Sequence, residues 1–194
     1  MSTTFTRSHL RSAAAILDNP HALNDNAART VRRMNTLGGI AMSHQERGLF
    51  ITGTNTEVGK TYVTALIAQS LVATGRRVGV YKPVASGCVV QDGRLVAEDA
   101  VTLWEAAGRP LTLDQVCPQR FSRPLAPHRA AAAEGKVVDE DLLRNGLAPW
   151  REGFDVVLVE GAGGLMSPVA EETYVADLAS EFGFPLVVVA ANTL

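Results

Sequence analysis

Short apolar runs alternate with longer helical stretches from about residue 48 onward. The runs are continuous rather than alternating, which is typical of strands covered on both faces of a sheet; they are Leu49–Ile51, Val78–Tyr81, Val156–Val159 and Leu186–Ala190. Between them the spacing predicts helices at Thr61–Thr74, Ala97–Ala107, Pro127–Glu134, Asp139–Trp150 and Tyr174–Phe182. Strands that alternate with helices indicate an α/β fold, a mainly parallel sheet with helices on both faces.

Polar and glycine-rich segments follow three of the predicted strands. These segments are Thr52–Thr61, Lys82–Gly87 and Glu160–Gly164. In open α/β sheets the ligand crevice lies outside the carboxyl ends of the strands. We therefore expect the three segments to converge on one ligand site.

The first segment resembles a phosphate-binding P-loop and predicts a P-loop NTPase-type sheet. Gly59, Lys60 and Thr61 match the end of that motif, although the strict spacing would place its first glycine at Thr54, one residue after Gly53. Backbone N–H groups at the start of the helix can surround phosphate oxygens, while the Lys60 ammonium attracts the β- and γ-phosphates. The Thr61 hydroxyl would bind Mg²⁺. The sequence thus predicts ATP as co-substrate and Mg²⁺ as cofactor.

The P-loop suggests functional roles for polar residues elsewhere in the chain. Lys82 ends an apolar strand and needs an anionic partner, although alone it would be read as a surface lysine. Ser86 can hydrogen-bond a substrate. Glu160 closes another apolar strand and is a candidate Mg²⁺-supporting carboxylate. Asp99, near a predicted helix start, would alone be read as a cap or surface residue.

Composition narrows the class of partner. The chain has 194 residues, a formal net charge of −2 and a pI of about 6.1, which gives no field for nucleic acid or anionic membrane. No apolar run approaches the roughly 18 residues of a membrane span. Cys88 and Cys117 are too few for a disulfide framework and predict reduced thiols in a cytoplasmic protein. A small-molecule partner is therefore expected.

The amino-terminal segment differs in character from the remainder. Residues 1–41 contain five Arg, two Asp and no Lys. An Arg-rich, acid-poor leader is compatible with a transit peptide, but Met42 opens a natural approach to the first strand. We therefore expect residues 1–41 to be a disordered extension or a mis-assigned start, and residues 42–194 to form the P-loop domain.

Four motifs together resemble dethiobiotin synthetases, in order and in approximate spacing. They are Thr52–Thr61, Tyr81–Gly87, Pro124–His128 and Val159–Gly164, and the resemblance runs from residue 48 to the chain end. It implies an enzyme of biotin biosynthesis, an ATP-dependent cyclo-ligase that joins CO₂ to 7,8-diaminononanoate through a carbamate and a carbamic-phosphoric anhydride. It also implies a homodimer, and further strands and helices after residue 194, so we expect the domain to be incomplete at its C-terminal end.

The same resemblance assigns roles to individual residues. Lys60 and Lys82 are the implied catalytic residues, Ser86 and Thr56 would contact the substrate, and Thr61, Asp99 and Glu160 would hold the metal. The implied nucleotide-binding residues are Glu57, Val58, Gly59, Lys60, Thr61, Tyr62, Asp99, Glu160, Gly161, Ala162 and Gly163. A carboxylate at Glu57 would repel phosphates, so it points outward or contacts the sugar or the substrate.

Three other interpretations remain open at this point. One is a partition-type ATPase switch, which typically carries an extra lysine where Thr54 and Asn55 stand. Another is a related P-loop ligase or amidotransferase, against which the motifs at Tyr81–Gly87 and Pro124–His128 argue. The third is an inactive ATP-binding fragment. Phosphate release that depends on diaminononanoate and bicarbonate would separate a ligase from a switch.

Overall fold

The structure is a computed structural model that describes residues 48–191. The chain divides into two units, Met1–Ala41 and Met42–Leu194, and the description below concerns the second. The predictions for residues 1–41 and for a start at Met42 lie outside the described residues. Within the described range, no helix is both long and apolar enough to cross a membrane.

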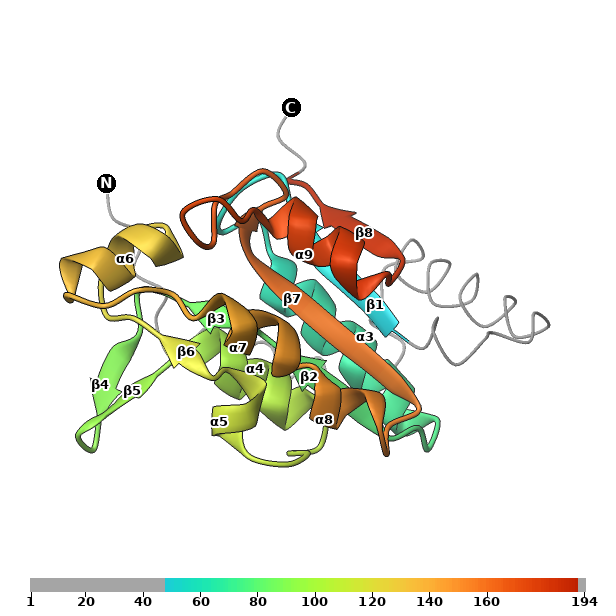
Figure 1. Cartoon of the computed structure of the whole chain (residues 1–194). Coiled ribbons are helices and arrows are strands. Elements are labelled where there is room, and N and C mark those ends of the chain that lie inside the picture. Colours follow the sequence, from blue (N-terminus) through green and yellow to red (C-terminus); the bar gives the residue numbers. More distant parts are fainter. Residues whose placement is uncertain (1–47, 192–194) are drawn as a thin grey trace. The chain divides into compact units, whose positions relative to one another are not determined.

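Four parallel strands form the central sheet in the order β2-β7-β1-β8. Buried apolar residues of these strands, among them Phe50, Val80 and Leu158, pack in one core with apolar residues of the helices and connecting segments. The predicted parallel α/β fold is confirmed (Figure 1). The strands are β1 (Gly48–Gly53), β2 (Val78–Tyr81), β7 (Val156–Gly164) and β8 (Leu186–Val189).

Helices cover both faces of this sheet. The side chain of Glu160 in β7 meets α3, whereas its neighbour Gly161 faces Val175 of α9, so the two helices lie on opposite faces (Figure 1). Phe182 of α9 also packs against Phe50 of β1. The helices are α3 (Lys60–Ala73), α4 (Glu98–Ala106), α5 (Leu113–Val116), α6 (Pro127–Ala133), α7 (Glu140–Asn145), α8 (Ala148–Arg151) and α9 (Val175–Phe182).

The single helix predicted over Asp139–Trp150 is wrong, because the structure divides it into α7 and α8. A β-carbon at Gly146 would collide with the Tyr81 hydroxyl, so the chain passes too close to β2 for any side chain there. Pro149, in the first turn of α8, lacks the N–H that a continuous helix would need. Tertiary crowding and one proline therefore end α7.

Several short strands were not predicted. The sequence Asp92-Gly93 turns the hairpin of β4 (Val89–Gln91) and β5 (Arg94–Val96), with positive φ at both turn residues. That dipeptide is a strong hairpin signal, but no element was predicted between Gly87 and Ala97. The two-residue strands β3 (Val84–Ala85) and β6 (Gln119–Arg120) pair in parallel. The third predicted strand also runs further than expected, through Glu160 to Gly164.

The last strand departs from the prediction that both of its faces are covered. β8 pairs with β1 and lies at the edge of the described sheet. The alternate side chains Leu186 and Val188 are 43% and 52% exposed. A continuous apolar run thus predicted the strand but not its place in the sheet.

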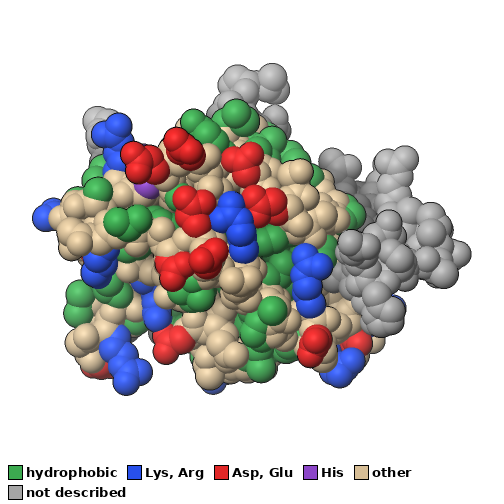
Figure 2. All heavy atoms as spheres, viewed as in Figure 1, with side chains coloured by type: hydrophobic (Ala, Val, Ile, Leu, Met, Phe, Trp, Pro, Cys, Tyr) green, Lys and Arg blue, Asp and Glu red, His purple; other side chains and the backbone are tan. Residues whose placement is uncertain are grey.

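Charged side chains link two helices on one surface of the fold. Figure 2 shows acidic side chains gathered around basic ones on the face that carries α7 and α9. Arg144 of α7 pairs with Glu181 of α9 at 2.6 Å and with Glu140 of its own helix at 3.2 Å. The side chains of these pairs are 32–42% exposed, so the pairs contribute little to stability compared with the apolar contacts beneath them.

Replacing Tyr81 with Phe should lower the free energy of unfolding by about 1 kcal/mol, because the buried hydroxyl donates to the carbonyl oxygens of Leu142 and Leu143, each at 3.0 Å. Urea denaturation measures this change. Tyr62→Phe is the matched control, since that ring is 56% exposed and should change stability by less than about 0.5 kcal/mol. Equal effects of the two variants would contradict the proposed anchoring of α7 by Tyr81.

Candidate active site

The predicted P-loop connects β1 to the start of α3. Gly59 precedes the helix with φ of 97°, a left-handed conformation that favours glycine. The buried Lys60 ammonium donates to the carbonyl oxygen of Asn55 at 2.9 Å, and the Asn55 side chain accepts from the amide of Thr56 at 2.8 Å. The loop therefore curls around its own lysine. Asn55 was not predicted, although Asn commonly hydrogen-bonds the backbone of turns.

Lys82 lies between two carboxylates from different elements. Its ammonium is 2.7 Å from Glu160 Oε1 of β7 and 3.0 Å from Asp99 of α4. Lys82 is 3% exposed and Glu160 is fully buried, whereas the Asp99 side chain is 55% exposed. The prediction that Lys82 needs an anionic partner is confirmed, and the partners are the two predicted metal carboxylates.

This cluster changes the proton affinities of its members. Burial alone would lower the pKa of Lys82, but attraction to Glu160 and Asp99 and hydrogen bonds to both outweigh it, so the pKa is raised. Attraction to Lys82 lowers the pKa of Asp99 against the opposing effect of burial. Burial, followed by repulsion from Lys82, lowers the pKa of Lys60. Relative to a free lysine, Lys82 therefore holds its proton more tightly and Lys60 holds its proton less tightly.

Two threonines of α3 also reach Glu160. The Thr61 hydroxyl donates to Oε1 at 2.9 Å, and the Thr64 hydroxyl donates to Oε2 at 2.9 Å. Sequence reasoning missed Thr64, although its place three residues after Thr61 puts both hydroxyls on one helix face. Together with Lys82, these donors satisfy a carboxylate that has no exposed surface.

A small cavity opens beside the charged cluster. It has a volume of about 100 Å³ and is lined by Ala85, Ser86, Gly87, Cys88, Ala97, Glu98 and Asp99. The predicted substrate residue Ser86 and the carboxylate of Asp99 therefore share one concavity. The amide of Gly87 donates to the carbonyl oxygen of Arg123 at 2.9 Å, which brings the segment Pro124–His128 against Lys82–Gly87.

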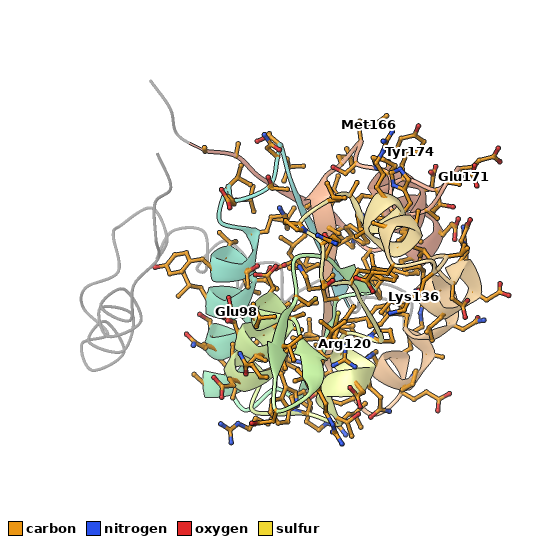
Figure 3. All side chains as sticks on the ribbon, turned by 90° about the vertical axis from the view of Figure 1, so that its left-hand side faces the viewer. Glu98, Arg120, Lys136, Met166, Glu171 and Tyr174 are labelled. Atoms are coloured by element: carbon orange, nitrogen blue, oxygen red, sulfur yellow. The ribbon has the colours of Figure 1, made fainter. Side chains whose placement is uncertain are left out.

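Other predicted site residues lie at the margins of this arrangement. Thr56, Glu57 and Tyr62 are exposed, and Glu57 adopts a positive φ of 57°. Figure 3 shows that Met166 and Tyr174, which are not predicted site residues, lie together at one end of the fold. They are away from Glu98, which lies at the start of α4 and lines the cavity. Gly161 faces α9 rather than α3, while Val58, Ala162 and Gly163 are partly buried. The structure brings Lys82, Asp99, Glu160 and Thr61 together, and it places the other predicted site residues outside this cluster.

The donor set fits a magnesium ion that shares its ligands with phosphate. Two carboxylates and the Thr61 hydroxyl meet here, and Mg²⁺ is usually bound by one or two carboxylates plus substrate phosphates. Within residues 48–191 no group of three or more His, Cys, Asp or Glu side chains could hold a metal by itself.

A strand, a glycine-containing loop with lysine, and a helix whose threonine meets a strand carboxylate define a P-loop nucleotide-binding protein of the α/β class. The family model described as an AAA domain matches residues 47–194. The chain belongs to this family.

Individual relatives show which enzymes the chain is similar to. An ATP-dependent dethiobiotin synthetase of Rhodopirellula baltica is 57% identical over 134 residues, covering 68% of this chain and 52% of the relative. The same enzyme from Phenylobacterium zucineum is 41% identical over 75% of this chain and 63% of the relative. That of Thermodesulfovibrio yellowstonii is 36% identical over 76% and 64%. The resemblance to dethiobiotin synthetases is confirmed, and the chain spans between about half and two thirds of these relatives.

Replacing Lys82 with Met should lower the free energy of unfolding by about 3–5 kcal/mol, because it leaves the buried Glu160 carboxylate without its countercharge. Guanidinium denaturation measures the change. The control is Lys136→Met, because the Lys136 side chain is 55% exposed and its ion pair with Glu134 is expected to contribute about 0–1 kcal/mol. If both variants lose the same stability, the ion pair of Lys82 is not the constraint inferred here.

Proposed function

We propose that this chain binds ATP and Mg²⁺ and catalyses the closure of the ureido ring of dethiobiotin from 7,8-diaminononanoate and CO₂. The observation that carries the proposal is the meeting of Lys82 with Thr61, Asp99 and Glu160 beside a phosphate-type loop. The relatives are ATP-dependent dethiobiotin synthetases, which supports the same activity. Location in the cytoplasm and assembly as a homodimer are parts of this proposal.

The P-loop has the equipment to hold the triphosphate. Amide N–H groups of residues 57–61 at the start of α3 face outward from a helix end, where anions are favoured. Lys60 exchanges its bond to the Asn55 carbonyl for a phosphate oxygen. Thr61, Asp99 and Glu160 hold Mg²⁺, which neutralises phosphate charge. The other members of the proposed nucleotide-binding set are Glu57, Val58, Gly59, Tyr62 and Gly161–Gly163.

The reaction begins with an amine of the substrate. One amine attacks CO₂, forms a carbamate and loses a proton, and the carbamate oxygen then attacks the γ-phosphorus while ADP leaves. Two anions must approach each other in this step. Lys82 and Lys60 offset their repulsion and stabilise the charge that develops during transfer, so they are the proposed catalytic residues.

Ring closure follows on the same substrate. The neighbouring amine attacks the carbonyl carbon of the carbamic-phosphoric anhydride, its proton is lost, and the bond to phosphate breaks. Ser86, in the cavity beside Asp99, orients the amines, and Thr56 contacts the substrate from the loop. Positioning and electrostatics supply the catalysis, because no protein nucleophile is required.

The purified chain should release phosphate only when ATP, Mg²⁺, bicarbonate and 7,8-diaminononanoate are all present, with dethiobiotin detected by mass spectrometry. Hydrolysis that ignores diaminononanoate would indicate an ATPase switch instead. Nucleotide binding without phosphate release would indicate an ATP-binding module.

Lys82→Ala should abolish ring closure, a loss of at least about 10²–10³-fold in kcat, because it removes the cation at the transferred group. Nucleotide affinity should stay within severalfold, since the P-loop is intact. Both measurements are made at low temperature on protein whose near-UV circular dichroism shows a native fold. Unchanged turnover in this variant would refute the catalytic role of Lys82.

A further inference from the structure

The two oxygens of the Glu160 carboxylate have different partners. Oε1 accepts from Lys82 at 2.7 Å and from Thr61 at 2.9 Å. Oε2 accepts from Thr64 at 2.9 Å. The carboxylate is fully buried, so each of its oxygens needs a donor to offset the loss of water.

Thr64 is built to donate to this oxygen. Its side chain is fully buried in α3, and its hydroxyl also lies 2.8 Å from the carbonyl oxygen of Lys60, which restricts its rotation. That carbonyl already accepts the helical amide four residues later. The hydroxyl proton therefore goes to the charged acceptor, because hydrogen bonds to ionised groups are about twice as strong as neutral ones.

Ligand binding would affect the two oxygens differently. In the function proposed above, Lys82 turns to the transferred phosphoryl group and leaves Oε1, while the Thr61 hydroxyl offers an oxygen lone pair to the metal. Thr64 presents no exposed atom to a nucleotide and keeps its bond to Oε2. Oε1 becomes free for the cation while Oε2 stays fixed.

We infer that Thr64 is a positioning residue, which holds Glu160 by Oε2 so that Oε1 faces the nucleotide-bound cation. The inference rests on the proposed binding of metal and ATP. Outer partners of metal ligands orient them, and their loss typically weakens metal binding about 10–100-fold. Thr64 thus sets how strongly the metal supports nucleotide binding, without touching either.

The test compares the affinity of a fluorescent ATP analogue with Mn²⁺ and with EDTA, since the ratio of the two Kd values reports the contribution of the metal. Thr64→Val should reduce this ratio about tenfold or more, while leaving the affinity in EDTA within about twofold. Thr64→Ser, which keeps the hydroxyl, should restore the ratio. Thr64→Ala removes the same hydroxyl from a smaller side chain and replaces Thr64→Val if that variant does not fold.

Thr102→Val is the matched control. The Thr102 hydroxyl of α4 donates to the carbonyl oxygen of Glu98 four residues earlier, the position that corresponds to the contact of Thr64 with Lys60. It has no carboxylate partner among the hydrogen bonds of residues 48–191. Its ratio should equal that of the unaltered chain. A ratio unchanged by loss of the Thr64 hydroxyl, or lost equally in Thr64→Ser, overturns the positioning role. An unaltered chain that shows no metal-dependent binding overturns the proposed function as well.

Discussion

The buried ion pair between Lys82 and Glu160 constrains most of the sheet around it. Two charges in an interior of low dielectric are costly to desolvate and become tolerable only when they meet with good geometry. Lys82 directly follows β2 and Glu160 lies within β7, so their 2.7 Å contact requires these strands to be neighbours in register. The sheet order β2-β7-β1 then places the P-loop, which follows β1, beside the same pair. One electrostatic requirement thus brings the three polar segments together.

The same carboxylate ties the helices of one face to the sheet. Thr61 and Thr64 dock α3 on Glu160, and Asp99 carries α4 to Lys82. Such buried charges are a poor means of gaining stability, because well-packed apolar residues often stabilise a fold more. Such charges are useful at a site that receives anionic phosphates without rearranging its backbone. The site of this AAA-domain family member is therefore preorganised by charges that already neutralise one another.

Local pattern predicted much of the fold. The apolar runs at Val78–Tyr81 and Val156–Val159 became β2 and the first half of β7, since continuous apolar sequence suits strands covered on both faces. The break between α7 and α8 was not predictable from periodicity, because Gly146 is needed where the chain passes the Tyr81 hydroxyl. Nor was the exposure of Val188 in β8, which depends on which strand lies at the edge.

The sequence likewise predicted some parts of the candidate site and not others. The sequence by itself determined the P-loop, with Lys60 and Thr61 at the start of a helix, because that motif is local and its conformation follows from adjacent residues. It also marked Lys82 and Glu160 as polar residues at the ends of apolar runs. Only the tertiary structure decided that these two form a pair and that Thr64 holds the second carboxylate oxygen. Those partners lie 78 and 96 positions apart, and strand order and register, not local pattern, bring them within hydrogen-bonding distance.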